Sequence, residues 1–152
     1  MDDQIPMPAL LRHARFTYGA AMRQALAAAG YDDIPRNGLY IIGGLAIETV
    51  DVPLAVLIRD LRVSKQVAGQ LVDTLVMRGY LDRTVDVADR RRLTVTLTER
   101  GRAAAAVQAA ARRTIDAALE AEVGAEAIAA ARHVLAALID LAPARDAPPD
   151  AA

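Results

Sequence analysis

Two glutamines and a lysine are the residues whose types and spacing could recognise the edges of nucleic-acid bases. Lys65, Gln66 and Gln70 begin a helix-forming segment, residues 65–78, that ends at Gly79. A rotation of about 100° per residue places both glutamines on one face of this helix. Gln can form two hydrogen bonds with adenine in the major groove, and Lys can bind guanine or phosphate. DNA recognition is the leading interpretation, and an ordinary helix with polar side chains in water is the alternative.

Three further residues belong to the same face or its border. Gly69 and Asp73 lie on it and Thr74 lies at its border. Gly69 would let the backbone come near a duplex. Ser64, the only serine of the chain, precedes the helix, and serine caps a helix by accepting a bond from a free backbone N–H. The other free N–H groups of this terminus can bind phosphate, so we expect Ser64 at the interface.

A second basic group lies between two segments that favour β-strands, Leu81–Val85 and Leu93–Thr98. The second segment alternates apolar and polar residues with a period of two, so a β-hairpin is predicted. Three consecutive arginines occupy its tip: Arg90, Arg91 and Arg92. Arginine on a projecting ribbon suits the narrow minor groove of A·T-rich DNA. A solvated turn whose charge is balanced by Asp86 and Asp89 is the alternative, and these acids would also order the loop.

Helices on both sides must position these groups. They are predicted at residues 9–29, 36–47, 54–61, 99–120 and 125–141, after an N-terminal arm and before a disordered tail from Pro143. The first helix has apolar side chains on two sides, which is typical of a helix buried between two bodies. The order of short helix, tight turn, capped helix and hairpin predicts a mainly α fold with a small β-hairpin wing (α+β), a winged helix-turn-helix.

Composition favours a DNA-binding protein only at the level of the central segment. The chain of 152 residues is long enough to bury a core, and 54% of it is hydrophobic although only 3% is aromatic. The formal net charge is −1, yet residues 54–102 contain ten basic and six acidic side chains, which leaves the flanks acidic. The positive charge of this central segment, and not the net charge of the chain, is therefore the property that indicates nucleic-acid binding. A charged surface that simply faces water is the alternative.

Several classes of protein are excluded by what the sequence lacks. Without cysteine there can be no disulfide, no thiolate catalysis and no thiol redox sensing. His13 and His133 could hold a metal only with ligands from a partner chain, so we expect no metal and no cofactor. An enzyme is not expected, because no motif places a base or an oxyanion site beside Ser64. No membrane span or export signal is recognisable, and a cytoplasmic location is predicted.

About fifty continuous residues resemble the MarR family of bacterial transcriptional regulators. The resemblance rests on Val63-Ser64-Lys65-Gln66, Leu71-Val72-Asp73-Thr74-Leu75, Arg78-Gly79-Tyr80-Leu81-Asp82-Arg83, Asp86-Val87-Ala88-Asp89-Arg90-Arg91 and Leu97-Thr98-Glu99-Arg100-Gly101. It implies a homodimer with interlocking terminal helices and two winged lobes that read a pseudo-palindromic operator, and a repressor is the expected kind of regulator. The expected organisation is a dimerisation helix in 1–34, the DNA-binding domain in 35–101, dimerisation helices in 102–142 and a tail in 143–152.

The resemblance also implies roles for individual residues. Asp73 would pair with a wing arginine, with Arg91 as the expected partner, and Asp89 would help to orient the wing. Arg83 joins the expected DNA contacts. Many family members release DNA when a small, often aromatic or phenolic, molecule binds near the junction of the two regions. Tyr18 and Tyr40 are the candidate walls of such a pocket, with two ordinary core tyrosines as the alternative.

A protein-association module is the competing function. A winged helix can serve as an adaptor that binds other proteins, with the terminal helices as its docking surfaces. In that case the face with Gln66 and Gln70 would tolerate charge reversal without any loss of DNA binding. In a DNA-binding protein, by contrast, affinity falls steeply with salt because counterions are released when arginines meet phosphates.

Overall fold

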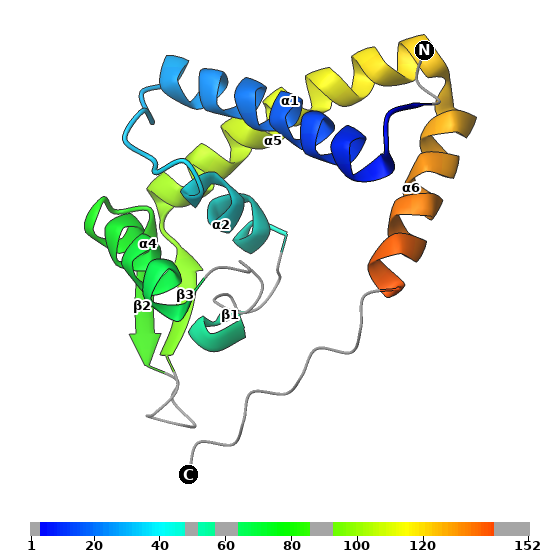
Figure 1. The fold of residues 1–152 in the computed structure, drawn as a ribbon. Coiled ribbons are helices and arrows are strands. Elements are labelled where there is room, and N and C mark those ends of the chain that lie inside the picture. The colour runs from blue at the N-terminus through cyan, green and yellow to red at the C-terminus, as the bar shows by residue number, and fades with distance from the viewer. Residues whose placement is uncertain (1–3, 48–51, 57–63, 86–92, 142–152) are drawn as a thin grey trace. The chain divides into compact units, whose positions relative to one another are not determined.

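The computed structural model describes residues 4–47, 52–56, 64–85 and 93–141. Its elements are α1 (Met7–Ala28), α2 (Gly38–Leu45), β1 (Val52–Pro53), α4 (Lys65–Met77), β2 (Leu81–Val85), β3 (Leu93–Leu97), α5 (Glu99–Val123) and α6 (Ala125–Asp140) (Figure 1). The chain divides into two compact units, Met1–Arg113 and Thr114–Ala152, and the boundary falls inside α5. No helix in the described part of the chain is long and apolar enough to cross a membrane.

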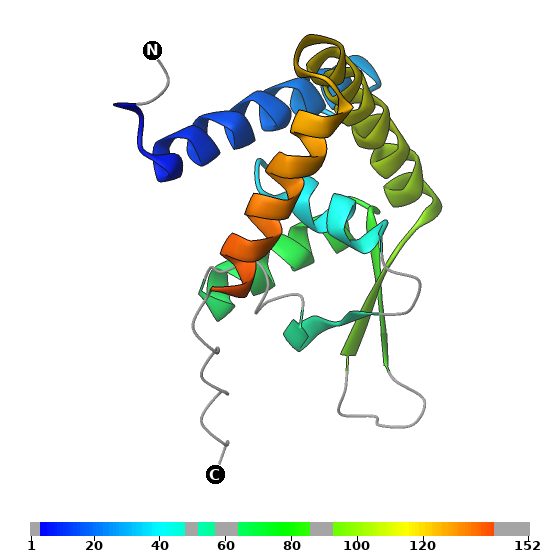
Figure 2. The ribbon, with the colours of Figure 1, turned by 90° about the vertical axis from the view of Figure 1, so that its right-hand side faces the viewer.

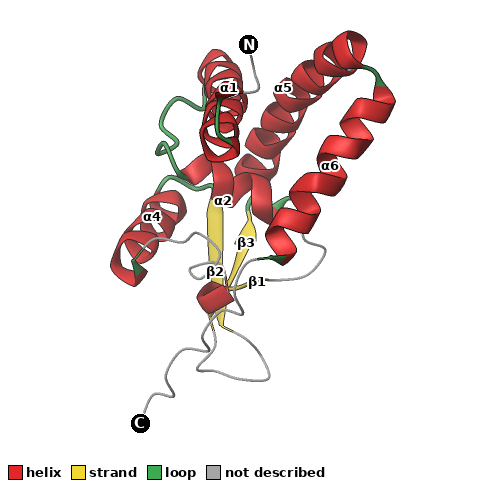
Figure 3. Ribbon diagram, turned by 45° about the vertical axis from the view of Figure 1, so that its right-hand side comes forward, coloured by secondary structure: helices red, strands yellow, loops and turns green. Residues whose placement is uncertain are grey.

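The three strands form one antiparallel sheet in the order β1-β3-β2, shown in yellow in Figure 3. The hairpin of β2 and β3 is the one that the alternating pattern predicts, and its register pairs Thr84 with Thr94 and Val85 with Leu93. Because β3 is the central strand, Thr94 is buried as well as Val95, and its hydroxyl bonds the hydroxyl of Thr84 at 2.6 Å. Strict alternation of buried and exposed residues therefore does not hold along β3.

The prediction for Pro53 is wrong. The sequence predicts it in the first turn of a helix over residues 54–61, but it lies in β1 and pairs with Thr94 of β3. An edge strand tolerates proline because one side of it needs no hydrogen-bond donor. Residues 54–56 are helical, and the rest of the expected helix lies outside the described residues.

The first unit is built around one apolar core. Helix α2 packs against α4 and β3, and α4 packs against β2 (Figures 1 and 2). The buried side chains come from α1, α2, α4, the sheet and the start of α5: Met22, Leu26, Leu39, Ile41, Ile42, Leu45, Val72, Leu75, Tyr80, Leu81, Val95, Ala104 and Ala105. The order of α2, the helical residues 54–56, α4 and the hairpin is a winged helix-turn-helix, so the predicted fold class is confirmed.

The second unit has no core of its own among its described residues. Helix α6 contains no buried residue, although its sequence is amphipathic. Its exposed large apolar side chains recur at helical spacing: Val134, Leu135, Leu138 and Ile139. Apolar residues in this arrangement are expected to be covered by another surface, because exposed contiguous apolar patches mark interaction sites.

Candidate nucleic-acid interface

Helix α4 has well-defined ends, as the sequence predicts. The Ser64 hydroxyl accepts a hydrogen bond from the Val67 backbone N–H at 3.3 Å, which confirms the N-cap. At the other end Gly79 has a positive φ of 74°, and its N–H bonds the Val76 carbonyl at 3.0 Å. The Tyr80 N–H reaches back to the Leu75 carbonyl at 2.9 Å, which completes a Schellman cap. Local signals alone therefore fix the length of this helix.

The outer face of α4 is exposed to solvent where the sequence predicts it. Lys65, Gln66, Gln70 and Asp73 are exposed, whereas the opposite face is buried in the core. A Cβ on Gly69 would meet nothing within 4 Å, so the backbone here is open to a close approach. The helix therefore presents two amides and an ammonium group to the outside from a rigidly packed support.

Two details of α4 differ from the expectation. The periodicity places Val67 on the buried side, but it is 48% exposed because it lies in the first turn, where little of the core reaches. The Thr74 hydroxyl donates to the Gln70 carbonyl at 2.8 Å within the helix. Thr74 is also half-buried. Because its hydroxyl already donates to Gln70, it can only accept a hydrogen bond from a ligand.

The acid on the outer face is held by an arginine of the hairpin. Asp73 forms a charge-assisted hydrogen bond and ion pair with Arg83 of β2. The resemblance suggests Arg91 as the partner instead. Arg91 lies outside the described residues together with Asp89, Arg90 and Arg92, so their roles stay predictions. Arg83 is thus engaged with Asp73 at the edge of the α4 face.

A cluster of polar side chains ties the end of α4 to the segment between α1 and α2. The Tyr80 hydroxyl donates to an Asp33 carboxylate oxygen, and Arg78 donates to the Asp33 backbone carbonyl. Arg100 of α5 donates to the same carboxylate oxygen at 3.2 Å and to the Tyr80 hydroxyl at 2.9 Å. Its guanidinium carbon lies 4.6 Å from the centroid of the Tyr80 ring, and Tyr31 meets that ring edge-on at 6.2 Å.

The electrostatics of this cluster follow from its contacts. The hydrogen bond from Tyr80, helped by the charge of Arg100, lowers the pKa of Asp33 against a smaller opposing effect of burial. Burial raises the pKa of Tyr80, and the hydrogen bond to Asp33 raises it further. The hydrogen bond with Tyr80 raises the pKa of Arg100. At neutral pH the cluster therefore contains a carboxylate, a neutral phenol and a guanidinium.

The start of α5 is fixed on the same region by Thr98 and Gly101. The Thr98 hydroxyl donates to the Gly79 carbonyl at 2.6 Å and accepts from the Gly101 N–H at 3.0 Å. A Cβ on Gly101 would lie 2.1 Å from the Tyr80 carbonyl oxygen, so only glycine fits. The Leu-Thr-x-x-Gly block therefore joins the wing, α4 and α5, a role that sequence reasoning did not assign.

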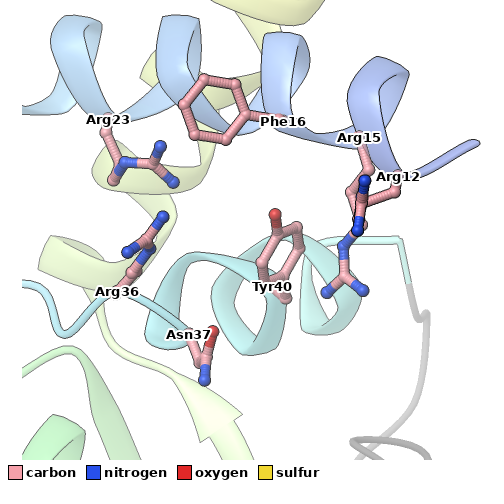
Figure 4. A pocket seen from close by; sticks show the side chains of 7 residues that line it. All are labelled: Arg12, Arg15, Phe16, Arg23, Arg36, Asn37 and Tyr40. Atoms are coloured by element: carbon pink, nitrogen blue, oxygen red, sulfur yellow. The ribbon is translucent and has the colours of Figure 1, made fainter. Parts of the chain in front are cut away.

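The two candidate pocket tyrosines have different surroundings. Tyr40 of α2 lines a pocket of about 290 Å³ that α1 and α2 form (Figure 4). Tyr18 is half-buried against the core and is not among the residues that line this pocket. The described residues contain no group of three or more His, Asp or Glu side chains that could hold a metal ion.

Comparison with solved structures identifies the fold. The MepR–DNA complex of S. aureus has a TM-score of 0.73 and 17% identity, and covers 90% of this chain and 98% of its own. FabT of Streptococcus pneumoniae in complex with DNA has a TM-score of 0.73 and 19% identity, with 86% and 91% covered. The reduced form of MarR from E. coli has a TM-score of 0.69 and 18% identity, with 90% and 98% covered. No family model and no curated protein matches the chain.

These structural similarities show that the chain and the solved structures share a fold. They extend over most of the chain and of each solved structure, so the winged helix-turn-helix and the long flanking helices belong to one shared architecture. This architecture agrees with the MarR resemblance of the sequence, which rests on residues 63–101 alone.

Proposed function

We propose that this chain is a MarR-like, sequence-specific DNA-binding transcriptional regulator that acts as a repressor. The observation that carries the proposal is the outer face of α4, where Lys65, Gln66 and Gln70 are exposed beside the capped N-terminus at Ser64. The supporting fold is shared with MepR and FabT, whose solved structures include DNA. Side chains of this kind on such a helix can bond adenine and guanine edges in a major groove.

The proposal includes a homodimer. In the first unit Ile5, Met7 and Leu10 near the start of the chain are exposed, and in the second unit the apolar side chains of α6 are exposed. A second copy would cover such surfaces, and a two-fold dimer would read half-sites about 34–36 Å apart, one turn of DNA. Light scattering during gel filtration at micromolar concentration should give twice the chain mass. A stable monomer would contradict this part of the proposal.

Selection of bound fragments from random duplex DNA tests the central claim. We expect a pseudo-palindromic sequence, and we expect log affinity to fall linearly with log salt concentration. Gln70→Ala should cost about 1–3 kcal/mol on the selected duplex and relax specificity at one base pair of each half-site. If Lys65 binds phosphate and not guanine, Lys65→Gln should weaken binding to all sequences alike and reduce the salt slope by about 0.9 per protomer. Gln24→Ala, at an exposed position of α1, is the matched control and should change neither.

The adaptor function is the alternative outcome. The double variant Gln66→Glu/Gln70→Glu introduces two carboxylates against the duplex and should abolish selected binding. If this double variant binds DNA as the wild type does, the α4 face is not a DNA-reading surface. Failure of the wild type to enrich any sequence would lead to the same conclusion.

Release of DNA by a small aromatic or phenolic effector is the last part of the proposal. The pocket beside Tyr40 supports it, since Tyr40 belongs to the same unit as α4 and α2 packs against α4. The charge of that pocket restricts the effector further.

A further inference from the structure

The pocket between α1 and α2 is unusually cationic for a protein with a formal net charge of −1. Two aromatic rings and an amide line it together with four arginines: Arg12, Arg15, Phe16, Arg23, Arg36, Asn37 and Tyr40. The sequence contains no Asp or Glu from Gln4 to Gly30, or from Pro35 to Ile47. The ion pairs Arg83–Asp73 and Arg100–Asp33 of the described residues involve none of the four arginines. Helix α1 and the residues just before α2 therefore bring arginines to the pocket, and neither helix contains a carboxylate of its own.

The arginines lie at two ends of the aromatic pair. Figure 4 shows Arg23 and Arg36 together on one side of the two rings, and Arg12 and Arg15 on the other. Eight residues separate Arg15 from Arg23 along α1, which corresponds to about 12 Å of helix. A single small anion cannot contact both ends, whereas an elongated molecule with a charge at each end can.

The aromatic rings form the middle of the pocket. The Arg15 guanidinium carbon lies 4.4 Å from the centroid of the Tyr40 ring, and that of Arg23 lies 6.0 Å from the Phe16 ring. The Tyr40 hydroxyl and a terminal Arg23 nitrogen approach Gly19, at 3.0 and 3.2 Å from where its Cβ would be. The absence of a side chain at Gly19 thus leaves room for the Tyr40 hydroxyl and the Arg23 guanidinium to pack against α1.

The volume of the pocket suits a small ligand. At about 290 Å³ the pocket is at the lower end of small-molecule sites. An apolar cavity of about 150 Å³ is enough to hold benzene, so the pocket has room for one ring with two small substituents.

We propose that this pocket binds a small planar organic dianion, an aromatic ring with an anionic group at each end. One group is held by Arg23, Arg36 and the Tyr40 hydroxyl, and the other by Arg12 and Arg15. The ring lies against Phe16 and Tyr40. The role of such a dianion as the effector that releases DNA rests on the proposed function, whereas its binding does not.

Calorimetric titration of the full chain with terephthalate tests the binding. We expect terephthalate to bind at least tenfold more tightly than benzoate, and neutral terephthalamide and inorganic phosphate to bind more weakly than either, because only the dianion engages both ends. Arg12→Gln/Arg15→Gln removes one end and should reduce the preference for terephthalate over benzoate to near one. Arg112→Gln/Arg113→Gln removes the same charge from an exposed part of α5 outside the pocket and should preserve the preference.

A second variant tests the shape of the pocket. Gly19→Ala adds one methyl group against Tyr40 and Arg23, and it favours the helix, so the protein should fold and bind terephthalate at least tenfold more weakly. Absence of terephthalate binding, equal affinity for benzoate or phosphate, or an unchanged preference in the Arg12/Arg15 double variant would overturn the proposal. Terephthalate binding by a protein that enriches no DNA sequence would refute the proposed function and leave this site standing. If the protein enriches a DNA sequence but does not bind terephthalate, the proposed function stands and the dianion site is refuted.

Discussion

The ion pair of Asp73 and Arg83 gives the sharpest test of the proposal that the α4 face binds DNA. Asp73 is the one acidic residue of α4, and Arg83 neutralises it. Arg83→Gln leaves a carboxylate facing the phosphates. At about 7 Å one such repulsion amounts to about 0.6 kcal/mol in water and about 2.4 kcal/mol at an effective dielectric constant of 20. An intermediate value of about 1 kcal/mol per protomer gives about 2 kcal/mol per dimer, or roughly thirtyfold weaker binding.

The double variant Asp73→Asn/Arg83→Gln separates charge from contact. It has the same net charge as the wild type, so its affinity should return to within about threefold if Arg83 acts by neutralising Asp73. The side chains of Arg83 and Asp73 are 31% and 58% exposed, so loss of the pair should cost at most about 1 kcal/mol of folding stability. Unfolding of the protein therefore does not obscure the binding result.

Fluorescence anisotropy with the selected duplex at several salt concentrations measures all three proteins. If the double variant binds as weakly as Arg83→Gln, then Arg83 contacts DNA itself and the neutralisation argument is refuted. If Arg83→Gln binds as the wild type does, the edge of the α4 face does not approach phosphates at all.

Three further predictions concern the support of this face. Gly101→Ala should lower the free energy of unfolding, measured in urea, by about 2 kcal/mol or more, because its Cβ would overlap the Tyr80 carbonyl. Gly69→Ala meets no neighbouring atom and should raise the free energy of unfolding by about 0.5–1 kcal/mol while it weakens DNA binding. Ser64→Ala should cost about 1 kcal/mol of stability, while Ser64→Asp keeps the cap and loses DNA affinity through its charge. The lowered pKa of Asp33 means that its carboxylate stabilises the fold above its ordinary pKa of about 4; the stability difference between the wild type and Asp33→Asn should therefore shrink as the pH falls from about 6 to about 3. The glycine argument is contradicted if Gly101→Ala and Gly69→Ala change stability in the same direction. The serine argument is contradicted if Ser64→Ala and Ser64→Asp bind DNA equally well. The Asp33 argument is contradicted if the stability difference between the wild type and Asp33→Asn does not change with pH.

The parts of the interface that the sequence could predict depend on local signals. Ser64 and Gly79 mark the ends of α4 through bonds to residues within five positions of them, and the alternation of residues 93–98 marks β3. The periodicity of α4 also separates its buried face from its exposed face. These features need no knowledge of the rest of the fold.

The parts that the sequence could not predict depend on distant contacts. The partners of Asp33 are 45 to 67 residues away along the chain, and no local pattern links them. The strand at Val52–Pro53 forms by pairing with β3, which is distant along the chain. Asp73 pairs with Arg83 because β2 lies beside α4 in the fold. The spacing of residues along the sequence does not show which arginine of the wing lies nearest to Asp73.

Asp33 also connects the segment beside the pocket to α4, the helix that we propose reads DNA. It belongs to the segment that joins α1, with Arg23, to α2, which follows Arg36, and it bonds Arg78 and Tyr80 at the end of α4. If binding of the proposed dianion moves this segment, the hydrogen bonds of Asp33 with Arg78 and Tyr80 give that movement a route to α4. Since coupling between two binding sites is reciprocal, the operator must then weaken dianion binding by the same factor by which the dianion weakens operator binding.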